Sequence, residues 1–149
     1  MARVLVTGMS GVGKSTLLAE LSRRGHFVVD TDYGGWTSAD GVWDEQRMAA
    51  LLAEYAEVVV SGTVDNQGRF YDCFDQVVLL SAPLSTLLSR VASRSNNSYG
   101  KTPAQQAEIE RYSQEVEPLL RGGATVELDG RRPAGELADA VERLLVATS

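Results

Sequence analysis

Short apolar runs alternate with longer amphipathic segments from one end of the chain to the other. The runs are nearly continuous in Val and Leu, which is typical of strands covered by helices on both faces. They lie at residues 3–7, 26–30, 57–61, 76–80 and 124–128. Apolar residues at helical spacing predict helices over 14–24 and 44–56, from Pro83 through Val91, over 103–120 and over 133–146. Strands separated by helices predict a mostly parallel sheet and an α/β fold.

Three segments fit neither period: residues 31–43, 61–75 and 93–103, which are rich in Gly, Ser, Asn and Asp. In an open α/β sheet, loops that leave the carboxyl ends of the strands meet at one edge, and ligands bind there. We therefore expect these loops to form a site. A length of 149 residues predicts a single domain spanning 1–149.

Composition narrows the possible partners. The formal net charge of −6 and the pI near 4.8 argue against a broad nucleic-acid surface, but not against a small anion in a local pocket. One cysteine and one histidine exclude a disulfide framework and a Cys/His zinc site, and Cys73 is expected to be a small buried residue. No apolar run is long enough to span a membrane, so the expected location is the cytoplasm.

The segment Gly8-Met9-Ser10-Gly11-Val12-Gly13-Lys14-Ser15 fits the pattern G-x-x-x-x-G-K-[ST] between a predicted strand and a predicted helix. Glycines let successive backbone N–H groups turn towards phosphate oxygens, and the helix start adds its positive end. Lys14 can reach the outer phosphates of a nucleoside triphosphate, and the Ser15 hydroxyl can bind Mg²⁺. The alternative is a glycine-rich turn with a chance Lys-Ser. The residues predicted to bind the nucleotide here are Gly8, Ser10, Gly11, Val12, Gly13, Lys14, Ser15 and Thr16.

Such a loop is shared by kinases, GTPases, ATPase switches and helicases. A guanine-reading N-K-x-D motif follows neither the fourth nor the fifth predicted strand, and the length excludes large motor ATPases. Three further elements narrow the class: Asp30-Thr31-Asp32, the Leu-x-x-Arg-x-x-x-Arg element at 87–94, and residues 129–133. Together with the glycine-rich loop they resemble the small P-loop kinases of the shikimate, gluconate and nucleoside-monophosphate kinase group, with the D-x-D most similar to shikimate kinases.

This resemblance implies a three-layer P-loop NTPase fold with a five-stranded parallel sheet in order 2-3-1-4-5 and a short lid at about residues 94–103. It also implies ATP and Mg²⁺ as cofactors and a small-molecule acceptor. Asp30 would support Mg²⁺ together with Ser15, and Asp32 would orient or deprotonate the acceptor hydroxyl. The alternative is a turn-forming D-T-D without chemistry.

Basic residues are implied at three further places. Lid arginines of these kinases neutralise the transferring phosphoryl group, which points to Arg94 as catalytic and to Arg90 beside it, with Lys101 as a second loop cation. Arg131 and Arg132 follow the fifth strand, where the resembled kinases hold adenine. The alternatives are a solvated basic helix face and a surface turn, respectively.

The acceptor would bind near Arg47, Gly62, Thr63 and Arg69, by the same resemblance. The match is imperfect, because shikimate kinases carry a glycine triplet where this chain has Ser61-Gly62-Thr63. Trp36 and Trp43 either line this pocket or belong to the core. The expected activity is phosphoryl transfer from ATP to a hydroxyl of a small polar acceptor, by a monomer or weak dimer with no nucleic-acid or membrane partner. A nucleotide or nucleoside kinase and an ATP-binding regulatory protein remain alternatives.

Overall fold

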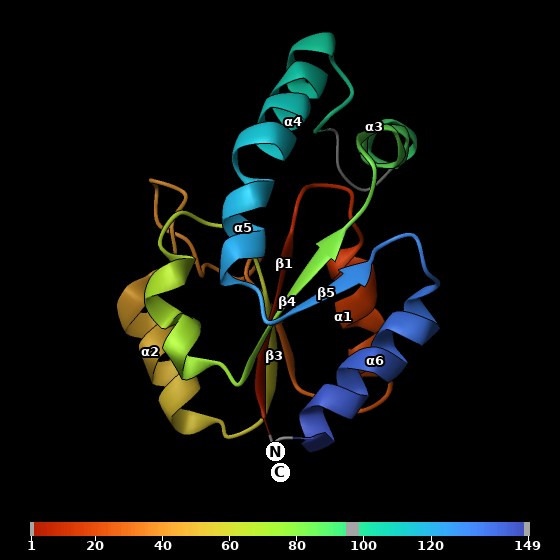
Figure 1. The fold of residues 1–149 in the computed structure, drawn as a ribbon. Coiled ribbons are helices and arrows are strands. Elements are labelled where there is room, and N and C mark those ends of the chain that lie inside the picture. Colours follow the sequence, from red (N-terminus) through yellow and green to blue (C-terminus); the bar gives the residue numbers. More distant parts are fainter. Residues whose placement is uncertain (1, 95–98, 148–149) are drawn as a thin grey trace.

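The computed structural model describes residues 2–94 and 99–147. Five strands form one parallel sheet in the order β2-β3-β1-β4-β5, which confirms the predicted P-loop kinase fold class (Figure 1). The strands are β1 (Arg3–Gly8), β2 (Val28–Asp30), β3 (Val58–Ser61), β4 (Gln76–Ser81) and β5 (Val126–Asp129). The α-helices are α1 (Lys14–Arg23), α2 (Glu45–Glu54), α3 (Leu84–Ser93), α4 (Pro103–Glu115), α5 (Glu117–Gly123) and α6 (Ala134–Ala147).

The register of the sheet brings the functional loops to one edge. Asp30 at the end of β2 lies opposite Ser61 at the end of β3, and Gly8 at the end of β1 lies opposite Leu80 in β4. Because all strands run in the same direction, the loops that follow them leave from the same side. Helices α3 and α4 extend beyond this edge (Figure 1).

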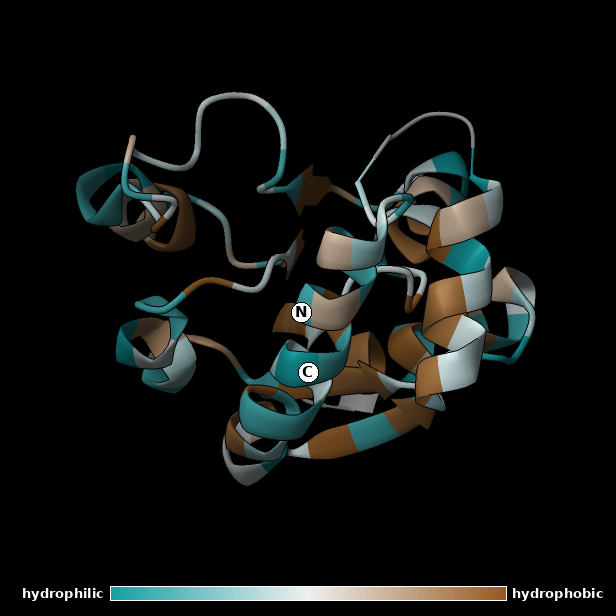
Figure 2. Cartoon of the chain, turned by 90° about the horizontal axis from the view of Figure 1, so that it is seen from above, coloured by the Kyte–Doolittle hydropathy of each residue, from teal (hydrophilic) through white to brown (hydrophobic). Residues whose placement is uncertain are grey.

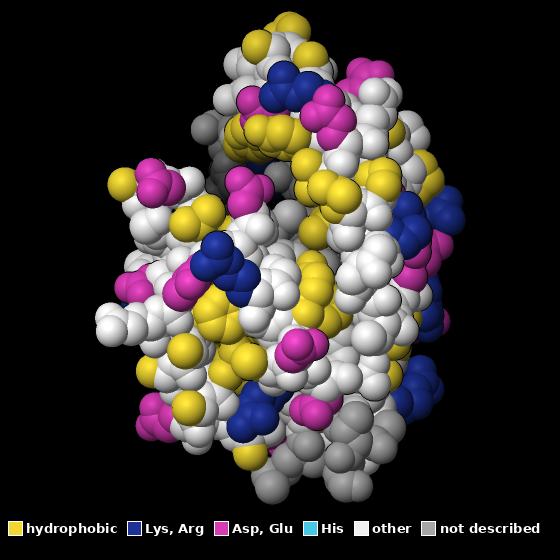
Figure 3. Space-filling model, turned by 60° about the vertical axis from the view of Figure 1, so that its left-hand side comes forward, with side chains coloured by type: hydrophobic (Ala, Val, Ile, Leu, Met, Phe, Trp, Pro, Cys, Tyr) yellow, Lys and Arg dark blue, Asp and Glu magenta, His cyan; other side chains and the backbone are white. Residues whose placement is uncertain are grey.

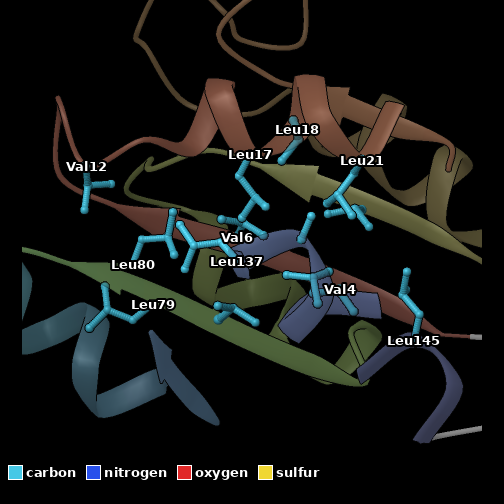
Figure 4. Packing of buried hydrophobic residues seen from close by; sticks show 14 of the residues in the cluster. Val4, Val6, Val12, Leu17, Leu18, Leu21, Leu79, Leu80, Leu137 and Leu145 are labelled. Carbon is cyan, nitrogen blue, oxygen red and sulfur yellow. The ribbon is translucent and has the colours of Figure 1, made fainter. Parts of the chain in front are cut away.

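Helices α1 and α6 cover one face of the sheet. Successive side chains of a strand point to opposite faces, so Val4 and Val6 of β1 face this layer while Leu5 faces the other. Hydrophobic colour is concentrated on the strands and on the helix sides that face them (Figure 2). The close-up labels part of this cluster (Figure 4): Val4, Val6, Val12, Leu17, Leu18, Leu21, Leu79, Leu80, Leu137 and Leu145.

The opposite face is covered by α2 and by a 3-10 helix, η1 (Gln67–Cys73), with α5 beside them. The centre of this layer is Trp43, which is 1% exposed and packs edge-on against Phe70 at 5.8 Å between ring centroids. Trp43 therefore belongs to the core, whereas Trp36 is only half-buried at its margin.

The structure differs from the sequence-based expectation in three places. The helix expected over 103–120 is two helices, because Pro118 has no N–H and its ring would clash with the carbonyl one turn earlier. The segment 61–75, which showed no period, contains η1. Cys73 is exposed rather than buried, because it ends η1 on the solvent side.

The surface carries mixed charge. On the face that includes α2, Asp and Glu side chains are interspersed with Lys and Arg (Figure 3). Over residues 2–94 and 99–147, the structure has no helix long and apolar enough to cross a membrane.

Candidate active site

The loop between β1 and α1 wraps closely against its neighbours, and this requires glycine. A Cβ on Gly8 would lie 2.5 Å from the carbonyl oxygen of Leu80, and one on Gly11 would lie 3.0 Å from that of Leu87. Gly13 has φ +109° at the start of α1, a conformation that side chains rarely adopt. Val12, by contrast, is buried and anchors the loop in the core. The loop therefore presents its backbone at the beginning of a ten-residue helix, where anions bind.

Lys14 folds back over this loop. Its Nζ donates to the carbonyl oxygens of Gly8 at 2.6 Å and Met9 at 3.2 Å. Loss of hydration around the ammonium lowers the pKa of Lys14 to about 8, although Asp32 and Asp30 oppose the shift. The site thus holds a cation that is poorly solvated and gains from the approach of an anion.

Two carboxylates lie at the carboxyl end of β2, Asp30 as its last residue and Asp32 two residues later. The Ser15 hydroxyl donates to Oδ2 of Asp30 at 2.7 Å, and the backbone N–H of Asp32 donates to Oδ1 of Asp30 at 3.1 Å. Desolvation at the site raises the pKa of Asp32, while the nearby Lys14 charge opposes this. The predicted Ser15–Asp30 pair is therefore in contact, with Asp32 beside it.

A hydroxyl and a carboxylate in contact are the oxygen donors that Mg²⁺ takes, with phosphate oxygens and waters completing its shell. The described residues contain no cluster of three or more His, Cys, Asp or Glu that would hold a metal alone. The donor set thus fits a cation that arrives together with phosphates.

The two arginines of the 87–94 element differ in their contacts. Arg90 donates through Nη1 to the carbonyl oxygens of Gly11 at 3.3 Å and Val12 at 3.1 Å, so it braces the glycine-rich loop. Arg94 donates through Nη2 to the carbonyl of Tyr99 at 2.8 Å, and its buried Nε has no partner among the described residues. The lid expected at 94–103 is described only at residue 94 and from Tyr99 onward, because 95–98 lie outside the described residues.

The loop after β5 forms the other end of the site. Gly130 packs against the glycine-rich loop, where a Cβ would lie 2.6 Å from the carbonyl oxygen of Val12. Arg131 pairs with both carboxylate oxygens of Asp129, and Arg132 lies 3.9 Å from a carboxylate oxygen of Glu136. Both arginines are exposed, and Asp129 fixes the plane of the Arg131 guanidinium.

One cleft of about 720 Å³ runs past most of these groups, although Gly8, Val12 and Asp30 are not part of its lining. It brings together eleven of the predicted site residues: Ser10, Gly11, Gly13, Lys14, Ser15, Thr16, Asp32, Arg90, Arg94, Arg131 and Arg132. It also contains six further residues: Tyr33, Tyr99, Gly130, Pro133, Ala134 and Leu137. The sequence indicates two of them, because Tyr33 directly follows the D-x-D and Tyr99 lies in the expected lid.

Gly62 and Thr63 do not line the cleft. Gly62 is buried beneath Trp43 and Thr31, and a Cβ there would lie 2.3 Å from the Thr31 hydroxyl. Trp43 donates through Nε1 to the same hydroxyl at 3.0 Å. The lack of a side chain at Gly62 therefore leaves room for the Trp43 indole.

Thr63 belongs to a polar network beneath the glycine-rich loop. Its hydroxyl donates to the Gly8 carbonyl at 2.6 Å and lies 3.1 Å from the Thr7 hydroxyl. Buried Gln67 donates to Thr7 at 3.1 Å and to the Tyr71 hydroxyl at 2.9 Å. Gln67 is 2% exposed, and a glutamine in a polar loop gives no local signal of such burial.

Arg47 and Arg69 also lie outside the cleft lining. Arg47 donates to the carbonyls of Gly34 at 2.7 Å and Gly35 at 2.9 Å, with its guanidinium 4.0 Å from the Trp36 ring centroid. Arg69 pairs with Glu45 at 3.2 Å. The structure thus does not bring these two arginines together with Lys14 and Asp32.

Comparison with known proteins agrees with this fold. A family model described as "AAA domain" matches residues 4–111. No curated protein sequence matches the chain. The P-loop kinase resemblance seen in the motifs is confirmed at the level of the fold by solved structures.

Three of these structures are kinases. The shikimate kinase from Acinetobacter baumannii in complex with shikimate has a TM-score of 0.74 and 18% identity, covering 100% of this chain and 95% of that one. The shikimate kinase from Aquifex aeolicus has a TM-score of 0.68 and 19% identity, with 94% of each chain covered. A gluconokinase from Sinorhizobium meliloti has a TM-score of 0.60 and 18% identity, covering 96% of this chain and 93% of that one.

Proposed function

The chain belongs to the AAA domain family, and from that premise we propose that it is an ATP- and Mg²⁺-dependent kinase that phosphorylates a hydroxyl of a small polar acceptor. The observation that carries the proposal is a continuous cleft that joins the glycine-rich loop to Asp32 on one side and to the loop after β5 on the other. A regulatory nucleotide-binding protein needs no acceptor carboxylate in that position. The fold shared with shikimate kinases and a gluconokinase supports the same class of reaction.

Donor binding follows from the loop. The backbone N–H groups and the α1 N-terminus attract the phosphates, and Lys14 exchanges its two carbonyl bonds for phosphate oxygens. The base would lie over the loop at 130–134, where Leu137 supplies apolar contact and the Arg131 plane, held by Asp129, supplies stacking. Ser15 and Asp30 would hold Mg²⁺, which supplies charge neutralisation of the phosphates when bound.

Transfer then depends on Asp32 and Arg94. Asp32 accepts a hydrogen bond from the acceptor hydroxyl and takes its proton as the oxygen attacks the γ-phosphorus. A pKa raised by desolvation makes Asp32 a stronger base than an ordinary aspartate. Arg94 lines the cleft, its Nε has no partner among the described residues, and its guanidinium stabilises the charge that builds on the transferring group.

The test is acceptor-stimulated ADP release, measured in a coupled assay over hydroxyl compounds and nucleoside monophosphates with Mg²⁺ and ATP. Asp32→Asn should keep ATP binding by calorimetry and lose transfer by at least about 100-fold, because the proton acceptor is gone. Asp40→Asn is the matched control, since Asp40 is an exposed carboxylate in the same loop after β2. Absence of stimulation by every compound, with ATP still bound, would favour the regulatory alternative.

A further inference from the structure

Resting on the proposed function, we propose that Thr63 is a positioning residue for Lys14: its hydroxyl keeps the Gly8 carbonyl hydrogen-bonded when the lysine leaves that carbonyl for the nucleotide. The Gly8 carbonyl oxygen accepts from both side chains, from Thr63 Oγ1 at 2.6 Å and from Lys14 Nζ at 2.6 Å. A carbonyl oxygen has two lone pairs, so these two donors use both of them. When one donor departs, the other remains.

The Thr63 hydroxyl continues the pairing of β1 beyond the end of β3. Just after β3, the Gly62 N–H donates to the Val6 carbonyl at 3.1 Å. Two residues further along β1, Gly8 donates its own N–H to Thr63 Oγ1 at 3.2 Å, and its carbonyl accepts from the same hydroxyl. The side chain of Thr63 thus holds both backbone groups of the residue at which the glycine-rich loop begins.

Buried Gln67 sets the direction of this bond. Its Oε1 accepts from the Val64 N–H at 2.9 Å, so its Nε2 faces the Thr7 hydroxyl and donates to it at 3.1 Å. Because the Thr7 oxygen accepts from this amide, its proton goes to Thr63 Oγ1, which lies 3.1 Å away. The Thr63 proton then goes to the Gly8 carbonyl. Aligned hydrogen bonds strengthen one another, so the chain of donors is well suited to hold that carbonyl.

Both carbonyls that Lys14 contacts keep a second donor in this way. Met9 accepts from the Val12 N–H at 3.2 Å, as Gly8 does from Thr63. Lys14 can therefore exchange both carbonyls for phosphate oxygens without leaving either one unpaired. The Val12 donor belongs to the backbone, whereas the Thr63 donor is a side chain that a substitution removes. Without it, nucleotide binding leaves a part-buried carbonyl unpaired, which predicts roughly tenfold weaker binding.

Calorimetry with ATP and Mg²⁺ on Thr63→Val and Thr63→Ser tests this role. Thr63→Val should raise the Kd for ATP about tenfold, whereas Thr63→Ser keeps the hydroxyl and should stay within about twofold of wild type. With an acceptor that reacts, KM for ATP should rise with the Kd and kcat should change little, because the cost arises on binding and persists in the transition state. A wild-type Kd in Thr63→Val, or a serine variant as weak as the valine variant, would overturn the inference.

Thr125→Val is the matched control. Thr125 Oγ1 also bonds both backbone groups of one strand residue, accepting from the Val77 N–H at 2.8 Å and donating to the Val77 carbonyl at 3.2 Å, but it lies outside the cleft lining. It should leave the Kd for ATP unchanged. Equal weakening in Thr125→Val and Thr63→Val would mean that lost stability is the cause, and would overturn the positioning role. If Thr63→Val does not fold, Thr63→Ala takes its place, with the same expected direction.

A second measurement needs no nucleotide. In wild type, Thr63→Val leaves the Gly8 carbonyl with Lys14, but in Lys14→Met the same substitution removes the second of the two donors. The urea midpoint should therefore fall by about 0.5 M more in the Lys14→Met background than in wild type. Additive shifts would contradict the shared carbonyl and overturn the inference.

The two proposals fail in different ways. ATP binding without turnover of any acceptor would remove the kinase function, while the Kd values of the Thr63 variants would still decide the role of Thr63. A wild-type protein that binds no ATP would remove both proposals.

Discussion

Replacing Lys14 by methionine should stabilise the protein without nucleotide, although the proposed nucleotide binding depends most on this residue. Methionine keeps the length of the side chain and removes the charge. Neither carbonyl that Lys14 contacts loses its last donor, because Gly8 still accepts from Thr63 and Met9 still accepts from the Val12 N–H at 3.2 Å. The change therefore removes a poorly solvated charge and leaves the loop's own hydrogen bonds in place.

The magnitude follows from the pKa. Loss of hydration lowers the pKa of Lys14 from its ordinary 10.5 to about 8, and that difference corresponds to about 3 kcal/mol at pH 7. Since the side chain keeps partial contact with water, we expect Lys14→Met to gain about 2 kcal/mol in the free energy of unfolding. In urea, a gain of that size moves the midpoint upward by about 1 M.

The pH dependence has a definite sign. Between pH 8 and 10.5 the unfolded chain holds a proton on Lys14 that the folded protein has released, so wild-type stability rises with pH in this window. The advantage of Lys14→Met should therefore be fully present at pH 7 and shrink to about a quarter of its value by pH 10.

Urea denaturation followed by circular dichroism at pH 7, 9 and 10 measures this directly. Lys101→Met is the matched control, because Lys101 is exposed and is the other lysine of the chain. We expect no change in midpoint for Lys101→Met at any of these pH values. A Lys14→Met protein that is less stable than wild type at pH 7, or whose advantage is the same at pH 7 and 10, would refute the reasoning.

Three further predictions concern the same edge of the sheet. Gly62→Ala should lower the free energy of unfolding by about 1–3 kcal/mol, because the new Cβ would lie 2.3 Å from the Thr31 hydroxyl. Gly122→Ala is the control: a Cβ there has open space, so the urea midpoint should not change. The pKa of Asp32 is raised above 3.8, so kcat/KM for the acceptor should fall as the pH decreases, with the midpoint of this pH profile above 3.8. A midpoint below 3.8 would mean that Asp32 is not the base. Because the pKa of Lys14 is about 8, ATP binding at pH 8 should take up about half a proton as Lys14 becomes fully charged. Calorimetry should then give binding enthalpies that depend on the buffer, and identical enthalpies in buffers of different ionisation enthalpy would contradict this prediction.

The elements that the sequence predicted well are those whose signal is local. Short runs rich in Val and Leu identified every strand, and the glycine spacing with Lys14 and Ser15 identified the turn from β1 to α1. The D-x-D after β2 led to the contact between Ser15 and Asp30, because parallel strands bring their carboxyl ends together. The order of the strands came from the resemblance of the motifs to a kinase group and is confirmed by the observed pairing.

The elements that it missed depend on partners far apart in the chain. The residues around Arg47 in the sequence do not indicate that its guanidinium donates to the Gly34 and Gly35 carbonyls and not to a ligand. Trp43 could belong to the core or to a pocket until the packing of Gly62 beneath it was known. Pro118 was the exception: its consequence for the helix after Pro103 is local, and the apolar period concealed it.

The two carbonyl bonds made by the Lys14 ammonium set a threshold for ligands. A visiting anion gains from Lys14 only what exceeds the bonds to Gly8 and Met9 that it displaces. A lone sulfate or inorganic phosphate engages the loop amides with one group only, whereas a polyphosphate spreads several groups over the α1 N-terminus, the loop amides and Lys14. The glycine-rich loop should therefore favour polyphosphates over single small anions, because its own carbonyls compete for the Lys14 ammonium.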